Sequence, residues 1–262
     1  PKPQELSNAI YGSAMASHSG AAVNAVAEVV SKQSLSGWEG QSLSNVLYAW
    51  SVLSLLGRAS PELNGMASAL FSEDNNRGTA SFDNPLQTRQ LYTAHMEAER
   101  VGLQGGGLAT TNGLQQAAAE EFKQYQAELQ IRKKHACDSE ALKQAMAALQ
   151  QAGYEAELGA GVGGDGFAVD LLVRHESRTS AIAVDTVVPS DFFHRPQGQL
   201  SGKTAAVHAQ IRQRCKLVVL SESEARQPGV VVGAVQRELA REAGQSGAGS
   251  GSSAGVAGST QP

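Results

Sequence analysis

Two aspartates lie where carboxylate chemistry could be placed on neighbouring strands. Asp170 belongs to a β-type run at 167–173, and Asp185 belongs to a second run at 181–188. The polar turn at 175–180 predicts that the two runs form a hairpin. Two such carboxylates could share one divalent ion and hold a water against a phosphate. Alternatively, each aspartate is a polar residue near a strand end that faces solvent or caps a turn.

Basic residues form a second group of candidates after the hairpin. Lys203 and Thr204 open a predicted helix at about 203–214, where backbone N–H groups and a cation could hold a nucleic-acid phosphate. The other basic candidates in this group are Arg195, Arg212 and Lys216. An ordinary solvated helix face explains the same residues. The earlier run 132–135 (RKKH) is compatible with phosphate contact or with cations placed favourably at a helix end.

Composition excludes several classes of function. No window approaches 18 uninterrupted apolar residues, which excludes a transmembrane helix and hence membrane insertion. The two cysteines can form neither a metal quartet nor a disulfide framework. The glycine-rich segment 159–166 is followed by a predicted strand rather than a helix, so we expect a flexible connector and not a phosphate loop.

The charge is unevenly distributed along the chain. The net charge is −4, but residues 1–130 carry 7 basic and 12 acidic groups, whereas residues 131–216 carry 11 basic and 9 acidic groups. A nucleic-acid binder usually has a more basic footprint than this. The acidic first half is compatible with a surface for protein partners.

A repeated segment organises the first half of the chain. Residues 4–11 (QELSNAIY) recur as residues 41–48 (QSLSNVLY), an offset of 37, and a second amphipathic stretch follows each copy. Two helices per 37 residues are typical of an α-solenoid. A third, degraded copy is expected around residues 90–92, after an irregular polar insertion at 72–87.

The second half changes from helical to strand periodicity. Helices are expected at about 113–131 and 138–152, the second with Asp138 as its N-cap. After the hairpin and the helix at 203–214, a strand at 216–220 and a helix at about 229–243 follow. We therefore divide the chain into degenerate helical repeats at 1–104, a glycine-rich break and linker helix at 105–137, an α/β domain at 138–243 and a disordered Gly/Ser tail at 244–262.

The order of these segments resembles a known family. The segments that carry the likeness are AVDLLV from 168, AIAVD from 181, FF at 192–193, GKTAAVHAQIR from 202 and KLVVL from 216. Together they resemble the RAP domain, which is found with FAST-kinase-like and octotricopeptide-repeat proteins of mitochondria and chloroplasts. The two LSN-containing helices resemble the repeats of those proteins, so the likeness covers about 4–74 and 88–243. We therefore expect an α-solenoid-like repeat region followed by a small α/β RAP domain.

The resemblance implies RNA binding and a role in organellar RNA stability, processing, splicing or translation. It also implies a compact α/β fold similar to PD-(D/E)XK nucleases. In that nuclease pattern Asp170 fits the first acidic position. The triplet 183–185 (AVD) stands where an acidic residue, a spacer and a lysine are required, so Ala183 replaces the acid and Asp185 replaces the lysine. Nuclease activity is therefore not expected, and neither is a cofactor, unless Asp170 and Asp185 hold Mg²⁺.

In helical-repeat RNA readers, residues at fixed repeat positions contact bases. Asn8 and Asn45 are polar and recur at the repeat offset, which makes them candidates, although such residues often cap or pack between repeats. Tyr11 and Tyr48 could stack on bases, but their helical phase predicts that they pack inside.

The sequence leads to one main hypothesis and two alternatives. The main hypothesis is an organellar factor that binds single-stranded RNA without catalysis, with a chloroplast favoured over a mitochondrion by the repeats and by the abundance of Ala and Gly. The chain is expected to be the end of a longer protein and to work with other RNA-processing proteins. The alternatives are a Mg²⁺-dependent nuclease built on Asp170 and Asp185, and a helical-repeat scaffold for protein partners.

Overall fold

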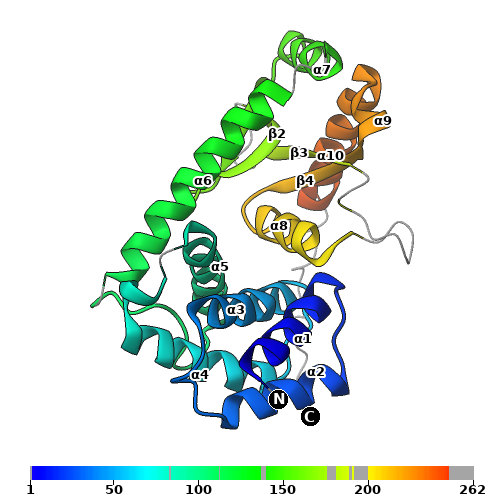
Figure 1. The fold of residues 1–262 in the computed structure, drawn as a ribbon. Helices are drawn as coiled ribbons and strands as arrows, with labels where there is room; N and C mark the ends of the chain where they lie inside the picture. Colours follow the sequence, from blue (N-terminus) through cyan, green and yellow to red (C-terminus); the bar gives the residue numbers. More distant parts are fainter. Residues whose placement is uncertain are drawn as a thin grey trace, which may run out of the picture.

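The computed structural model describes residues 2–82, 84–111, 113–136, 140–175, 181–188, 191 and 200–247. Arg195, the predicted N-cap Asp138 and most of the predicted tail lie outside the described residues. The described part is mostly helical, with one four-stranded mixed sheet in its C-terminal half (Figure 1).

The first half consists of helices that pack in two rows, which we call the helical region. In one row α1 (Pro3–Met15) packs on α3 (Gly40–Leu55), and α3 packs on α5 (Pro85–Val101). In the other row α2 (Ala21–Lys32) packs on α4 (Pro61–Arg77). Apolar side chains at helical spacing, such as Leu6 and Ile10 in α1 and Leu43 and Leu47 in α3, are buried between the rows.

The predicted polar insertion at 72–87 is wrong for most of its length. Helix α4 continues to Arg77, because Phe71 and Asp74 are buried on its inner face while the polar residues around them remain more exposed. A short 3₁₀ turn, η1 (Thr79–Ser81), follows, and α5 starts at Pro85 with the Asn84 side chain accepting a hydrogen bond from the N–H of Leu86.

The sheet has the strand order β1-β2-β3-β4. Strands β1 (Glu155–Val162), β2 (Phe167–Arg174) and β3 (Ile182–Val187) are antiparallel neighbours, which confirms the hairpin of the second and third strands. Strand β4 (Lys216–Ser221) runs parallel to β3, and α8 (Gly202–Arg212) lies between them in the chain.

Helices cover both faces of this sheet. On one face α7 (Glu140–Gln151), α9 (Glu222–Ala225) and α10 (Pro228–Gly247) enclose a core that includes Leu171 and Val184. On the other face α6 (Leu114–Ala136) and α8 pack on Leu172 and Ala183, which alternate with the first pair along the strands. We call the sheet together with α6–α10 the α/β unit.

The segment 159–166, predicted to be a flexible connector, is instead the end of β1 and a tight turn. The reason is the close approach of α6. Gly159 has φ +60°, and a Cβ atom there would lie 2.6 Å from the backbone nitrogen of Lys134. At Gly161 a Cβ atom would lie 2.5 Å from the Gln130 amide nitrogen. The glycines therefore let a helix cross directly over the strand.

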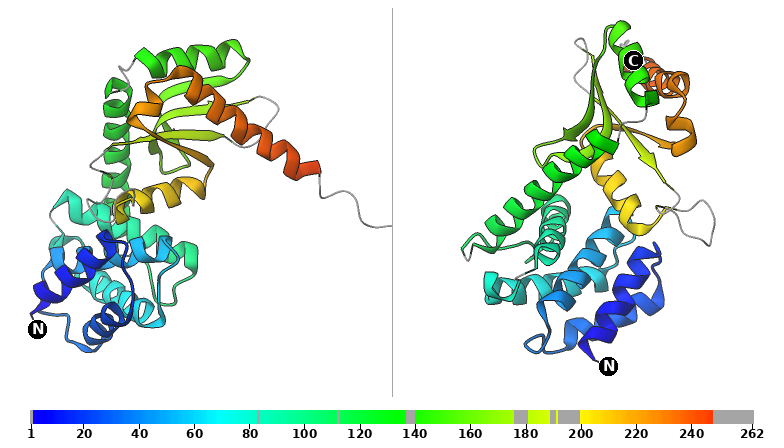
Figure 2. Two further views of the ribbon diagram at one scale, coloured as in Figure 1. Left: turned by 90° about the vertical axis from the view of Figure 1, so that its right-hand side faces the viewer. Right: turned by 45° about the horizontal axis from the view of Figure 1, so that its top comes forward.

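Helix α6 also joins the two halves of the molecule. It packs against α5 in the helical region and against β1 and β2 in the sheet, as Figures 1 and 2 show. A second contact is made by α8, which packs on α3 and α1; a Cβ atom at Gly202 would lie 2.0 Å from the carbonyl oxygen of Ala14. The surface between the halves is therefore built from α1, α3, α5, α6 and α8.

We expect Gly159→Ala to lower the free energy of unfolding by at least ~2 kcal/mol. The new Cβ would push α6 away from β1, at a cost of about 1–3 kcal/mol for overpacking, and would strain the left-handed backbone by about 1–2 kcal/mol. Urea unfolding measures the loss. Gly164→Ala is the matched control, because a Cβ atom at Gly164 meets nothing within 4 Å. Equal stabilities of the two variants would contradict the close packing of α6 on β1.

Candidate functional site

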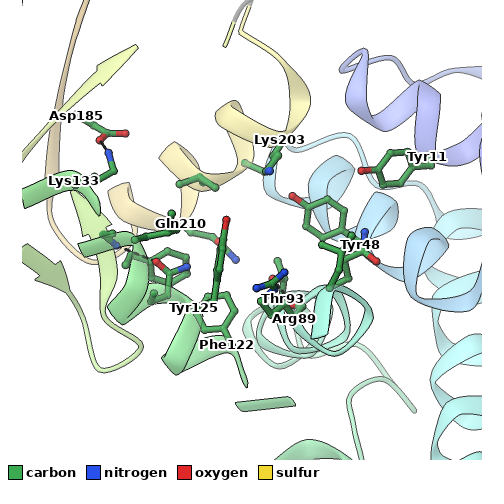
Figure 3. A pocket seen from close by; sticks show the side chains of 18 residues that line it. Tyr11, Tyr48, Arg89, Thr93, Phe122, Tyr125, Lys133, Asp185, Lys203 and Gln210 are labelled. Atoms are coloured by element: carbon green, nitrogen blue, oxygen red, sulfur yellow. Dashed lines mark hydrogen bonds and ion pairs between the residues drawn. The ribbon is translucent and has the colours of Figure 1, made fainter. Parts of the chain in front are cut away.

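A cavity of about 220 Å³ lies where the helical region meets the α/β unit (Figure 3). We call it the junction cavity. Its lining comes from α1, α3, α5, α6, β2, β3 and α8, so neither half forms it alone. Polar and aromatic side chains supply much of the lining: Tyr11, Tyr48, Arg89, Gln90, Thr93, Phe122, Tyr125, Gln126, Lys133, Phe167, Asp185, Lys203 and Gln210.

Three tyrosines contribute aromatic surface to the cavity. The rings of Tyr11 and Tyr48 lie 6.3 Å apart between centroids, and Tyr125 faces the cavity from α6. Burial, together with the neighbouring phenols, raises the pKa of Tyr48 above its ordinary value, so this phenol is neutral at physiological pH. The prediction that Tyr11 and Tyr48 pack inside is only half right, since both are partly buried against the helical core but also line the cavity.

Two cations lie among these rings. The Arg89 guanidinium lies over the Tyr125 ring, 4.1 Å from its centroid, and also approaches Glu121 at 3.6 Å. Lys203 has no carboxylate within ion-pair distance among the described residues. Figure 3 shows the side chains of Lys203, Tyr48 and Tyr125 directed toward the same space from three different helices. A cation next to an aromatic surface suits a phosphate joined to a planar ring.

Two glutamines in the lining are held in place by hydrogen bonds. The Gln126 side-chain oxygen accepts a hydrogen bond from the N–H of Ala168, 3.1 Å away. The Gln90 side-chain nitrogen donates to the side-chain oxygen of Asn45 across α5 and α3, also at 3.1 Å. A backbone N–H can only donate, so the bond from Ala168 fixes the orientation of the Gln126 amide, whereas the bond of Gln90 joins it to a second side-chain amide.

The two predicted aspartates do converge, but around a lysine that the sequence did not suggest. Lys133 reaches the sheet from α6, and its Nζ donates to Asp170 Oδ1 at 3.0 Å and to Asp185 Oδ1. The second oxygen of Asp170 accepts the N–H of Thr186 at 2.6 Å. The second oxygen of Asp185 lies 3.0 Å from Nε2 of His208, a residue that is fully buried.

Burial and charge act on these groups in opposite directions. Burial raises the pKa of Asp170, and the neighbouring Lys133 charge only partly offsets it. Burial would also raise the pKa of Asp185, but the hydrogen bond from His208 and the charge of Lys133 outweigh it and lower that pKa. Burial lowers the pKa of Lys133, yet the two carboxylates more than compensate and raise it, so the ammonium form is stable.

The donor set does not fit the shared divalent ion considered from the sequence. All four carboxylate oxygens of Asp170 and Asp185 are engaged by Lys133, Thr186 or His208. Within the described ranges, no group of three or more His, Cys, Asp or Glu side chains is placed to hold a metal. The alternative that each aspartate faces solvent or caps a turn is wrong as well, since both are largely buried in one network.

The other predicted contact residues are scattered. Lys203 lines the junction cavity, whereas Asn8 is exposed on α1 and Asn45 is turned to Gln90. Thr204 bonds to Asp191 at 3.2 Å and to Ser201 at 3.0 Å, so it holds the start of α8 instead of an incoming phosphate. Arg212 and Lys216 line a separate hollow that also includes Glu238.

Tyr125, Arg89, Gln90 and Gln126 were not identified as site residues from the sequence. Lys133 and His208 stood out only as basic residues, Lys133 within the run 132–135 and His208 within the helix at 203–214, and their pairing with the aspartates was not predicted. The third repeat, at residues 90–92, gave the only signal for the α5 side of the cavity. None of the helices that the structure describes is long and apolar enough to cross a membrane.

Comparison with known proteins adds no relative: no protein-family model and no curated protein sequence matches this chain.

We expect Lys133→Met to lower the free energy of unfolding by about 3–5 kcal/mol, because it leaves two buried carboxylates without their cation. Adding Asp170→Asn and Asp185→Asn should recover most of this loss, because the triple variant has no carboxylate left unpaired. Urea unfolding at about pH 8 measures both, and Lys134→Met, at an exposed neighbouring position, is the control.

The loss of stability in Lys133→Met has a defined pH dependence. The folded pKa of Lys133 is raised above the ordinary value of 10.5, so its contribution is complete below that pH and disappears as pH rises through the folded pKa. The stability difference between wild type and Lys133→Met should therefore stay constant from about pH 8 to 9.5 and shrink only at higher pH. A Lys133→Met variant as stable as the Lys134→Met control would contradict the buried ion network.

Proposed function

We propose that this chain binds single-stranded RNA at the junction cavity and does not catalyse a reaction on it. The observation that carries the proposal is the lining of the cavity, where Tyr48 and Tyr125 lie beside Lys203 and Arg89. Proteins bind single strands by stacking bases on aromatic side chains while cations contact the backbone. A duplex offers no exposed base faces for such stacking.

Few cations are available at the cavity, which limits the electrostatic contribution to the free energy of RNA binding. The whole chain has a net charge of −4, and Arg89 is partly neutralised by Glu121. A binder of this kind depends on stacking and shape more than on a basic surface, and it releases few counterions. Binding that depends on stacking and shape is therefore compatible with the acidic composition of the helical region.

The absence of catalysis in this proposal rests on the Lys133 network. The carboxylates that a metal-dependent nuclease would need are already bound to Lys133 and His208. The resemblance to RAP-domain proteins supports RNA as the ligand and an organellar role in RNA stability, processing, splicing or translation, with a chloroplast favoured. The α1–α5 packing is compatible with the repeat region of that family.

The proposal is tested by the fluorescence anisotropy of a labelled single-stranded RNA of about 12 nucleotides across a salt series. Binding should weaken as salt rises, with a slope of about −0.7 for each phosphate contacted. Lys203→Ala should weaken binding and make the slope shallower by about that amount. Tyr125→Ala should weaken binding by about 5- to 100-fold with little change in slope, because it removes stacking and leaves the phosphate contacts.

Arg58→Ala is the control for charge, since Arg58 is exposed and lies outside the cavity lining. The same samples, incubated with Mg²⁺ and run on a denaturing gel, should contain intact RNA for both wild type and Asp170→Ala. Failure of wild type to bind at low salt would contradict the proposal. Mg²⁺-dependent cleavage by wild type but not by Asp170→Ala would favour the nuclease alternative instead.

A further inference from the structure

The lining of the junction cavity contains a hydrogen-bond donor that the protein leaves unused. The Gln126 side chain is only 7% exposed, and its Oε1 atom accepts the backbone N–H of Ala168. Because a backbone N–H can only donate, the other end of this amide is the nitrogen. The Nε2 atom has no acceptor among the described residues but keeps accessible surface, and the residue lines the cavity. Gln126 therefore presents N–H groups of fixed orientation to a ligand.

A second amide in the lining is also without a partner. Gln210 is only 4% exposed, and its side chain makes no hydrogen bond within the part of the chain that the structure describes. Both of its amide atoms keep accessible surface. Figure 3 shows Gln210 and Tyr125 approaching the cavity from α8 and α6. Since nothing fixes its orientation, the Gln210 amide can turn to donate or to accept, whichever a ligand requires. Folded proteins usually satisfy such largely buried polar groups, so two free amides in one cavity point to a ligand.

The size and walls of the cavity restrict the acceptor that these amides can meet. A volume of about 220 Å³ is below the ~300–1,000 Å³ of pockets that enclose a whole drug-sized molecule, so the cavity admits one small group. Tyr48 and Tyr125 provide aromatic walls, which favour a planar group. A neutral amide compensates poorly for the lost hydration of a phosphate, whereas a neutral carbonyl oxygen costs far less to bury. The expected group is therefore small, flat and carries a carbonyl oxygen.

Resting on the proposed function, we infer that the junction cavity selects pyrimidine bases, and that Gln126 Nε2 donates to a carbonyl oxygen of the pyrimidine ring. Unstacked bases of single-stranded RNA are recognised by hydrogen bonds to their edges and by aromatic side chains on their faces. Uracil and cytosine are single rings with a carbonyl oxygen. Adenine is larger and has no carbonyl oxygen. Gln126 is thus a specificity-determining residue for the RNA, and Gln210 can complete the contact with the same base edge.

The neighbouring cation leaves the Gln126 donor free for the base. Lys203 lies on α8 at the cavity, close to Tyr48 in Figure 3, where it can contact the phosphate attached to an inserted base. The charged part of the nucleotide then meets a charged side chain, and the neutral base meets neutral amides. This division matches phosphate contacts that position a strand and base contacts that select its sequence.

Gln126→Glu tests the contact, because glutamate keeps the shape of glutamine, can still accept the N–H of Ala168 and replaces the free donor by an acceptor. Gln124→Glu is the matched control, since Gln124 is exposed on the same helix and the change adds the same charge. Gln210→Met is a second variant, which removes the other free amide without breaking a hydrogen bond among the described residues. Thermal unfolding verifies that each variant is folded.

Anisotropy is measured at about pH 8, where carboxylates are ionised, with oligouridine and oligoadenosine of about 12 nucleotides each. The quantity compared is the ratio of the two affinities within each protein. Intrinsic differences between the two RNAs, such as the stronger stacking of adenines, are the same for every protein and cancel in this comparison. A contact to a phosphate cancels as well, because both RNAs have the same backbone.

Wild type should prefer oligouridine, and Gln126→Glu should lower the ratio of affinities by about 5- to 150-fold, because an acceptor then faces the carbonyl oxygen. Gln210→Met should lower the ratio by about 2- to 10-fold, and Gln124→Glu should leave it unchanged. A ratio unchanged in Gln126→Glu, or in Gln210→Met if Gln126→Glu does not fold, would overturn the base contact but leave RNA binding intact. No binding of either RNA by wild type would overturn both the contact and the proposed function.

Discussion

The Lys133 ammonium between Asp170 and Asp185 is the interaction on which the arrangement of this molecule depends. It holds α6 to the middle of the sheet at the point where Gly159 lets the helix backbone come close. Removing two carboxylates from water is costly, and it is tolerated only where a cation and further hydrogen bonds satisfy their oxygens. Thr186 and His208 supply those bonds, so each of the four carboxylate oxygens has a partner within the protein.

Because α6 contacts both α5 and the sheet, fixing α6 also fixes the helical region relative to the α/β unit. A second contact between the helical region and the α/β unit is made by α8, which packs on α1 and α3. The junction cavity is what remains between these contacts, and Lys133 and Asp185 belong to both the network and the cavity lining. The two aspartates thus have a structural role, and the junction cavity lies next to them.

The helices and strands that follow from local periodicity were predicted from the sequence. Fewer of the features that depend on contacts between residues far apart in the chain were predicted. The structure confirms the predicted strands at 167–173 and 181–188, which are β2 and β3. It also confirms the predicted helix at 203–214 as α8 and the predicted strand at 216–220 as β4. Strand β1 was missed because its glycines, needed for the approach of α6, remove the apolar alternation that identifies a strand.

The candidate site was predicted only in part, for the same reason. Asp170, Asp185 and Lys203 were identified from residue type and position, but Lys133 pairs with aspartates 37 and 52 residues away. That pairing follows from how α6 crosses the sheet, which no local pattern encodes. Tyr125 and Gln90 likewise become cavity residues only when α5 and α6 pack side by side.

The most direct test of the account is to locate bound RNA on the protein. A single-stranded RNA containing 4-thiouridine is cross-linked to the full chain by ultraviolet light, and the modified peptides are identified by mass spectrometry. If RNA binds at the junction cavity, cross-links should form to the segments of α3 and α6 that carry Tyr48 and Tyr125. Cross-links confined to the exposed surface around Asn8, or to the separate hollow at Arg212 and Lys216, would contradict it.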